Sequence, residues 1–377
     1  MRIYSLYTSF KAPVAGLLLS MFITGCGGGG GGSKTPPPPP SPPPPPPIVI
    51  SGGGIKGPLT DAIVTVFGFD ATAAGFKGVL IDSGTTDSTT AITGLSLPSP
   101  TTPPYIMEIN SDETTRDITT GAVPIITTMS TVITQQMLDS GLPIYATPIT
   151  TFAVSLAVSN ADSNILPWTG NNDSTTSAAE FLAALSIAAD QTLSTVGFGA
   201  DSTVDIFATP PLINADTVTT EEQQAVAMYR SAVESIAAIL YQISEQTSAS
   251  NPGGVLAELV ADLADDNIIN GSAGDLINIL TLEIFGQNPL MLNIPNSLQT
   301  VLDVQTILDS ETSITGSTTI TVELTDGTIV TTTLPAQTNP DSDGDGVLNA
   351  EDDFPEDASE SVDTDGDGIG DNRDVDD

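Results

Sequence analysis

Apolar and polar residues alternate in short runs over residues 48–121, which are also rich in β-branched residues, glycine and proline. Two runs predict strands, residues 63–67 and residues 105–109, because a period of two places every second side chain on the same face. Turn-forming residues flank both runs. The pattern predicts a small β-sandwich-like module over residues 48–124.

After Thr127 the spacing of apolar residues moves from two towards 3.6, which is typical of amphipathic helices. Thr147 followed by Pro148 predicts a helix start, with the threonine as cap and the proline at the first helical position. Ser177 and Glu180 have the spacing of a capping box, and Gly197 predicts the end of that helix. We therefore predict a mainly α-helical domain over residues 125–317.

The clearest helical pattern begins at residues 219–222. Its apolar residues recur at alternating intervals of three and four, at Val226, Tyr229, Val233, Ile236, Leu240 and Ile243. Such a seam is compatible with a coiled coil, but it is short, so packing in the core of a helical domain is the favoured interpretation. Further helices are predicted from three apolar sets: Leu256, Leu259, Val260 and Leu263; Leu276, Ile277 and Leu280; and Leu298, Val301, Leu302, Gln305 and Leu308.

Two runs of alternating β-branched residues, 318–324 and 328–334, flank Asp326-Gly327, and this arrangement predicts a β-hairpin over residues 318–335. The predicted fold class is therefore multidomain α+β. The β-sandwich-like module comes first, then the mainly α-helical domain with its terminal hairpin, and last a set of acidic loops over residues 340–377.

Charge and composition narrow the function. The chain carries 8 Lys and Arg against 47 Asp and Glu, a formal net charge of −39 at pH 7, so it lacks the basic face that nucleic-acid binding needs. It contains no histidine, which excludes Ser-His-Asp triads and His-ligated zinc. Hydrophobic residues make up 39% and mean hydropathy is positive, which argues against a wholly disordered chain.

The amino terminus predicts a secretory signal over residues 1–25. Arg2 and Lys11 precede a short apolar run that ends in Ile23, Thr24, Gly25 and Cys26. These last four residues resemble the bacterial lipobox, and the chain has one cysteine, which lies at the expected cut site. The resemblance implies cleavage before Cys26 and acylation of it. An ordinary signal peptide is the alternative.

Several acyl chains on Cys26 would anchor the protein stably in a lipid bilayer. Because Gly27 rather than aspartate follows the cysteine, analogy with Gram-negative sorting implies the outer membrane, with the body facing the periplasm or the cell surface. Glycines 27–32 and the prolines of residues 36–47 then form a tether over residues 26–47, in which polyproline is a stiff rod of about 3.1 Å per residue.

Residues 54–62, Gly-Ile-Lys-Gly-Pro-Leu-Thr-Asp-Ala, followed directly by a strand, resemble the opening of carboxypeptidase-regulatory or transthyretin-like β modules. Residues 86–87, 95–98 and 105–106 are similar to later strands of that family, and the resemblance covers about seventy residues. In that family the module is a structural or adhesive spacer, and it contributes no catalytic residues to this sequence.

The carboxyl terminus contains two segments that align without a gap, 22 residues apart. Oxygen-bearing side chains fall at positions 1, 3, 5, 9 and 12 of each segment, and glycine falls at position 6. Ca²⁺ binds six to eight oxygen atoms, and a tight loop of this kind can direct its oxygens towards one ion. The backbone carbonyl of position 7 completes each set. The predicted ligands are Asp341, Asp343, Asp345, Val347, Asn349 and Asp352 in the first loop and Asp363, Asp365, Asp367, Ile369, Asp371 and Asp374 in the second.

These loops resemble bacterial thrombospondin type-3 repeats more than EF-hands, because position 12 is aspartate and Phe354-Pro355 would interrupt an exiting helix. The resemblance implies Ca²⁺ as the bound ion. The alternative is a disordered acidic tail.

The favoured function is a non-enzymatic, calcium-binding surface lipoprotein with a structural or adhesive role, whose partner is an envelope protein or an extracellular ligand. One alternative is a carbohydrate hydrolase that uses paired carboxylates. The other is a partner-binding subunit of an envelope complex. No nucleophile elbow, P-loop or dinucleotide fingerprint occurs in the sequence, so it indicates no catalytic residues.

Overall fold

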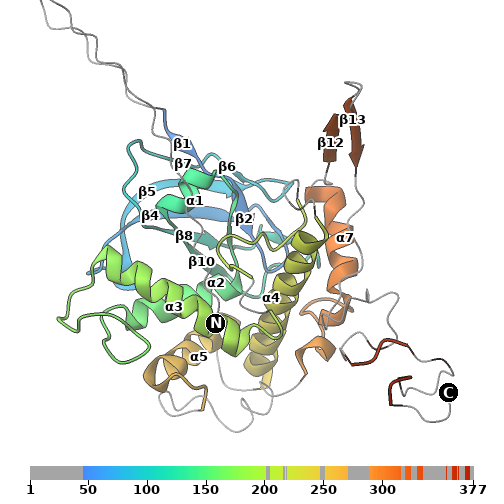
Figure 1. Ribbon diagram of the computed structural model, residues 1–377. Coiled ribbons are helices and arrows are strands. Elements are labelled where there is room, and N and C mark those ends of the chain that lie inside the picture. The colour runs from blue at the N-terminus through green and yellow to red at the C-terminus, as the bar shows by residue number, and fades with distance from the viewer. Residues whose placement is uncertain are drawn as a thin grey trace, which may run out of the picture. The chain divides into compact units, whose positions relative to one another are not determined.

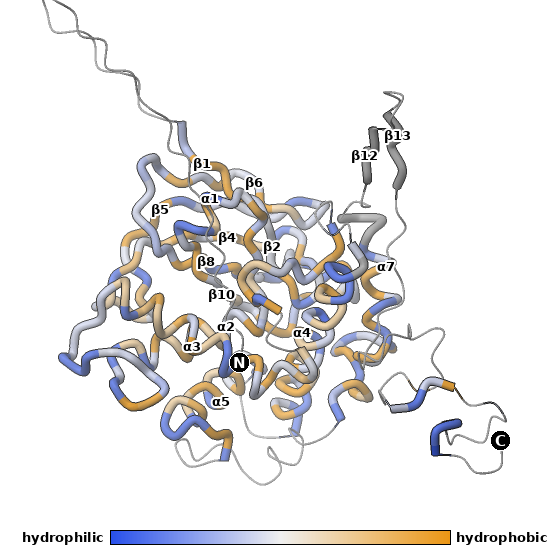
Figure 2. Tube along the Cα trace, viewed as in Figure 1, coloured by the Kyte–Doolittle hydropathy of each residue, from blue (hydrophilic) through white to orange (hydrophobic). Residues whose placement is uncertain are grey.

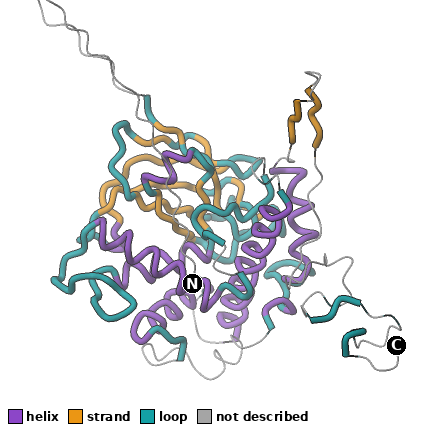
Figure 3. The backbone as a smooth tube through the Cα atoms, viewed as in Figure 1, coloured by secondary structure: helices purple, strands orange, loops and turns teal. Residues whose placement is uncertain are grey.

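The computed structural model describes the larger part of the chain and shows a mixture of strands and helices (Figure 1, Figure 3). The described residues are 46–200, 204–214, 217, 219–246, 251–270, 288–315, 319–323, 329–333, 354, 359–362, 364 and 370–373.

A five-stranded antiparallel sheet forms the β part of the fold. In spatial order its strands are β10 (Thr128–Ile133), β8 (Tyr105–Asn110), β4 (Ile63–Phe69), β5 (Lys77–Thr86) and β6 (Ile92–Thr93). The strands predicted at residues 63–67 and 105–109 are confirmed as β4 and β8. The register between β4 and β5 shifts after Val66, where extra residues on β5 bend the strand pair.

Three shorter strand pairs surround the sheet. They are β1 (Ile48–Val49) with β7 (Ser96–Leu97), β2 (Gly52–Gly54) with β11 (Ile144–Ala146), and β3 (Leu59–Thr60) with β9 (Arg116–Asp117). The β2–β11 pair is parallel. Gly52 has a φ of +129°, and a Cβ built on it would lie 1.8 Å from the Ile144 carbonyl oxygen, so only glycine fits there.

The helices follow the predicted capping signals. They are α1 (Gln135–Ser140), α2 (Pro148–Asn160), α3 (Ala178–Val196), α4 (Thr220–Gln246), α5 (Pro252–Asp266) and α7 (Val304–Thr315), with 3₁₀ turns at Ala74–Phe76, Pro289–Met291 and Val301–Asp303. Thr147 caps α2 with Pro148 at its first position, Ser177 and Glu180 form the capping box of α3, and Gly197 ends α3. All three predictions are confirmed.

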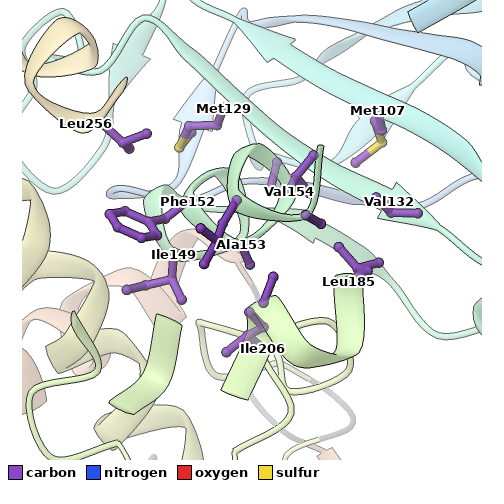
Figure 4. Packing of buried hydrophobic residues seen from close by; sticks show 14 of the residues in the cluster. Met107, Met129, Val132, Ile149, Phe152, Ala153, Val154, Leu185, Ile206 and Leu256 are labelled. Atoms are coloured by element: carbon purple, nitrogen blue, oxygen red, sulfur yellow. The ribbon is translucent and has the colours of Figure 1, made fainter. Parts of the chain in front are cut away.

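Helix α2 lies at the centre of the hydrophobic core, where it contacts β10, α3, α4 and α5 (Figure 4). Ten of its residues are buried, so it has no broad polar face. Met129 and Val132 of β10 lie on one side of it, and Leu185 of α3 lies on another (Figure 4). Apolar segments from both the strands and the helices therefore meet around α2 (Figure 2).

The domain boundary predicted at residues 124/125 is not a structural boundary. Strand β10 follows it in sequence and pairs with β8, and β11 pairs with β2. One hydrophobic cluster extends from Ile50 of the β part to Leu263 of α5. The prediction was wrong here because β10, Thr-Met-Ser-Thr-Val-Ile, is buried on both faces and its apolar and polar residues do not alternate, so it carries no strand period.

The apolar seam of α4 is confirmed as core packing, since all six of its residues are buried within the chain. The helix predicted from Leu298 begins later than expected, because Leu298 is fully exposed, Leu302 is 62% exposed, and a 3₁₀ turn precedes α7. Val301, Val304, Ile307 and Leu308 pack with residues of α4 in a second, smaller cluster.

The predicted hairpin is confirmed as the antiparallel pair β12 (Thr319–Glu323) and β13 (Ile329–Thr333). Its Asp326-Gly327 turn and the helix predicted around Leu276 lie outside the described residues. Within the described part of the chain, no helix combines the length and apolar character needed to cross a membrane.

Candidate functional site

The predicted lipid attachment site and almost all of the predicted calcium ligands lie outside the described residues. These are Cys26, the six ligands of the first loop, and Asp363, Asp365, Asp367, Ile369 and Asp374 of the second. Asp371 is the one predicted ligand that the structure describes. Among the described residues, no group of three or more acidic or cysteine side chains is placed to hold a metal ion.

Asp371, at position 9 of the second loop, folds back on the beginning of that loop. Its two carboxylate oxygens accept hydrogen bonds from the backbone N–H and the hydroxyl of Thr364, both at 2.8 Å, and its own N–H donates to the Val362 carbonyl at 3.0 Å. Residues seven and nine positions apart therefore come together, so this part of the loop is turned back on itself. The ligands predicted for the loop offer carboxylate and carbonyl oxygens, which are the donors that Ca²⁺ prefers.

Glu360 stabilises the same closure from outside the repeat. Its side chain is buried, its Oε2 accepts a hydrogen bond from the Asn372 N–H at 3.0 Å, and its Oε1 lies 3.4 Å from Nε of Arg373. A Cβ on Gly370 would lie 2.2 Å from Glu360 Oε2, so glycine permits this close approach. Sequence reasoning missed Glu360 because it falls outside the repeated positions.

A second site, absent from the sequence predictions, is a group of five buried charged residues that we call the buried charge cluster. It consists of Lys56, Asp117, Arg230, Glu234 and Glu311. Lys56 lies in the turn before β3, Asp117 on β9, Arg230 and Glu234 on α4, and Glu311 on α7. The cluster therefore joins four segments that are distant in sequence.

Two arginine–carboxylate contacts hold one half of the cluster. Both Nη atoms of Arg230 donate to the carboxylate of Glu311, at 2.8 and 2.7 Å, and its Nε donates to Glu234 Oε1 at 2.9 Å. Such bidentate pairs are strong and geometrically specific. Thr119 donates to the same Glu311 carboxylate and lies 3.3 Å from Arg230.

Lys56 holds the other half. Its Nζ donates to Asp117 Oδ2 at 3.3 Å and lies 3.4 Å from Glu234 Oε2, and the three side chains are at most 2% exposed. Asp117 Oδ1 instead accepts backbone N–H groups, from Thr119 at 2.8 Å and from Thr120 at 3.4 Å. The two oxygens of Asp117 thus have different partners.

The formal charges of the cluster do not cancel, because it contains three acidic and two basic side chains. Burial raises the pKa of Glu234 above its usual value, although Lys56 and Arg230 oppose this. Burial would lower the pKa of Lys56, but Glu234 and Asp117 together raise it. Lys56 is therefore held protonated, and burial favours the protonated form of Glu234.

The sequence contained a signal for this cluster that the apolar pattern obscured. Basic residues are rare in this chain, and Arg230 and Glu234 stand four apart within an otherwise apolar stretch of α4. Lys56 likewise stands in a run of small and apolar residues. Charges at such positions must be paired when the segment is buried. Their partners are distant in sequence, so only the structure identifies them.

Two neighbouring cavities, of about 290 and 460 Å³, share Leu142 and Ala208 in their walls. The first is mainly apolar and is lined by Tyr145 and Pro210 among others. The second is lined by Asp190 and Asp205, among others. If the chain were a hydrolase that uses paired carboxylates, these two residues would be its candidate pair in this cavity.

Comparison with known proteins does not assign the chain to a family: no protein-family model, curated protein or solved structure matches it.

Proposed function

We propose that this protein is a calcium-binding lipoprotein of a Gram-negative outer membrane, with a structural or adhesive rather than an enzymatic role. The observation that carries the proposal is the duplicated spacing of carboxylates and glycine in residues 341–352 and 363–374. The turn in which Asp371 meets Thr364 supports it, because it brings position 9 of the second loop to position 2.

In this proposal the body formed by the sheet and helices is held away from the membrane by the proline-rich tether. The β part of the body, from β1 to β10, acts as a spacer, and residues 54–62 within it resemble the opening of carboxypeptidase-regulatory modules. The acidic loops fold when calcium binds, because residues 341–377 contain 16 acids and one arginine and would repel one another without metal. The free energy of calcium binding would then stabilise the folded form of the loops.

Calcium binding is tested by titration calorimetry on the full chain. The wild-type protein should bind two Ca²⁺ ions with a Kd of about 10⁻⁴–10⁻³ M, typical of extracellular modules, and Mg²⁺ more weakly because it needs a smaller octahedral cage. Asp345→Ala and Asp367→Ala should each remove one site, since position 5 contributes a direct ligand.

Asp357→Ala is the matched control. It removes the same charge from the tail but lies between the two loops, so both sites should remain. If Asp357→Ala weakens binding as much as Asp345→Ala does, calcium is attracted by overall charge and the loops are not sites. The absence of any binding heat would leave only an acidic tail.

Lipid anchoring is tested by Cys26→Ser. This variant should leave the membrane fraction and accumulate as a soluble chain, because the acyl chains that provide stable attachment are missing. Intact mass of the wild-type protein should show an acylated chain that begins at Cys26. Gly32→Ser, in the tether, should remain in the membrane. A wild-type chain that retains residues 1–25, or that has a free thiol at Cys26, would rule out the lipoprotein.

A further inference from the structure

Three side chains of the buried charge cluster lie around one point in the interior. Lys56 Nζ is 3.3 Å from Asp117 Oδ2 and 3.4 Å from Glu234 Oε2. A primary amine, a carboxyl group and a second carboxyl group are thus within reach of one another, with little access for water. Nζ therefore lies against the Asp117 carboxyl group, whose carbon, Cγ, is the atom that an amine attacks, and holding two such groups together favours the reaction between them.

We propose that Lys56 and Asp117 condense to an amide that cross-links the chain, and that Glu234 carries the proton during this reaction. The bond would be an intramolecular isopeptide bond between the turn before β3 and strand β9. The proposal depends on the cluster alone and is independent of calcium binding and of the lipid anchor.

The reaction balances without a further reagent. Lys56 starts as an ammonium and Asp117 as a carboxylate, and a proton that passes from Nζ to Oδ2 gives a neutral amine and acid with the same net charge. The nitrogen then attacks Cγ of Asp117, so that the Nζ–Cγ bond forms and the Cγ–Oδ2 bond breaks. Oδ2 leaves with two protons as water, and Glu234 ends in the protonation state in which it began.

Asp117 is held in a way that favours this attack. Its Oδ1 accepts the backbone N–H groups of Thr119 and Thr120, at 2.8 and 3.4 Å. Oδ1 is the oxygen that becomes negative when the amine adds to Cγ, so these N–H groups act as an oxyanion hole. Oδ2, the oxygen that leaves, is the one that faces Lys56.

Glu234 has the position that a proton carrier requires. Arg230 fixes its Oε1 at 2.9 Å, whereas its buried Oε2 makes no hydrogen bond within the described residues and lies beside Nζ of Lys56. Burial raises the pKa of Glu234, which makes a protonated form accessible. It can therefore accept a proton from nitrogen and return one to the leaving oxygen.

The reaction starts from an ion pair, because the neighbouring carboxylates raise the pKa of Lys56 against the effect of burial. An amide nevertheless replaces two charges that are costly to bury. Gly57 allows the close approach, since a Cβ there would lie 1.9 Å from Asp117 Oδ1.

The cross-link would have a mechanical consequence. It would close a loop from Lys56 to Asp117 that contains the six strands β3, β4, β5, β6, β7 and β8. Tension that enters from the amino-terminal side of Lys56 would pass directly to Asp117, and these six strands would not bear it. A tethered surface protein would benefit from this protection.

Peptide mapping of the denatured wild-type full chain tests the proposal. Trypsin needs a free lysine amine, so cleavage after Lys56 should be lost. Further digestion should release a joined pair of peptides that contain Lys56 and Asp117, lighter by one water than their sum. Lys77 is an internal control. Its Nζ lies only 2.8 Å from Glu108 Oε1, but its side chain is 34% exposed and has no second carboxyl group in contact among the described salt bridges. It should be cleaved normally.

Three variants complete the test. Lys56→Arg keeps the positive charge but cannot form the amide, Asp117→Ala removes the carbon that is attacked, and Glu234→Gln removes the proton carrier. All three should give unlinked peptides, while Glu108→Gln should remain linked. Complete cleavage after Lys56 in the wild-type chain, with peptides of full mass, would overturn the cross-link whether or not the variants fold. Full linkage in folded Glu234→Gln would overturn the role of Glu234.

Discussion

Glu311→Ala is expected to lower the free energy of unfolding by about 3–5 kcal/mol, which is the usual cost of removing one partner of a buried ion pair. Arg230 is fully buried, and two of its strongest hydrogen bonds, at 2.8 and 2.7 Å, end on Glu311. Without that carboxylate, the guanidinium keeps Glu234 and the Pro211 carbonyl but loses its bidentate partner. Urea denaturation followed by circular dichroism measures the change.

Glu108→Ala is the matched control. Glu108 also pairs with a base, Lys77, at 2.8 Å, but that pair is partly exposed, so its loss should cost about 0–1 kcal/mol. Equal losses for the two variants would contradict the view that the buried charge cluster stabilises the attachment of α7 to the rest of the body.

The parts of the fold that the sequence predicted well are those set by local chemistry. Thr147, Ser177, Glu180 and Gly197 act at helix ends through their own backbone neighbours, so their residue types are sufficient. Strand β4 and the seam of α4 are likewise visible from the period of their apolar residues, since alternate residues of β4 and all the seam residues of α4 are buried. Strand β8 is visible as a short apolar run with turn residues around it.

The sequence failed where burial is complete. β10 and most of α2 are buried, and their apolar residues show no clear period that would distinguish a strand from a helix or one domain from the next. The start of α2 was visible only from its cap. The predicted domain boundary at residue 125 was wrong because this period is missing. β10 completes the sheet, and α2 packs against it.

The candidate sites divide in the same way. The calcium ligands are proposed from sequence alone, because one loop supplies its ligands at fixed intervals, and all of them except Asp371 lie outside the described residues. The buried charge cluster could not, because Lys56, Asp117, Glu234 and Glu311 are brought together by tertiary packing. The rarity of basic residues indicated that Lys56 and Arg230 matter, but it could not name their partners.

Phe152→Ala tests whether the sheet and the helices are one cooperative unit. Phe152 is fully buried on α2 in the cluster that joins them, so the substitution should cost about 3–5 kcal/mol. Because the core is shared, hydrogen exchange should show that amide protection of β8 and of α5 falls together. Two independent domains divided at residue 125 would instead leave β8 unchanged. Ile165→Ala, at a side chain that is 72% exposed, should alter stability by about 0.5 kcal/mol or less. A loss of protection confined to the helices would restore the two-domain arrangement and would limit the buried charge cluster to a contact between domains.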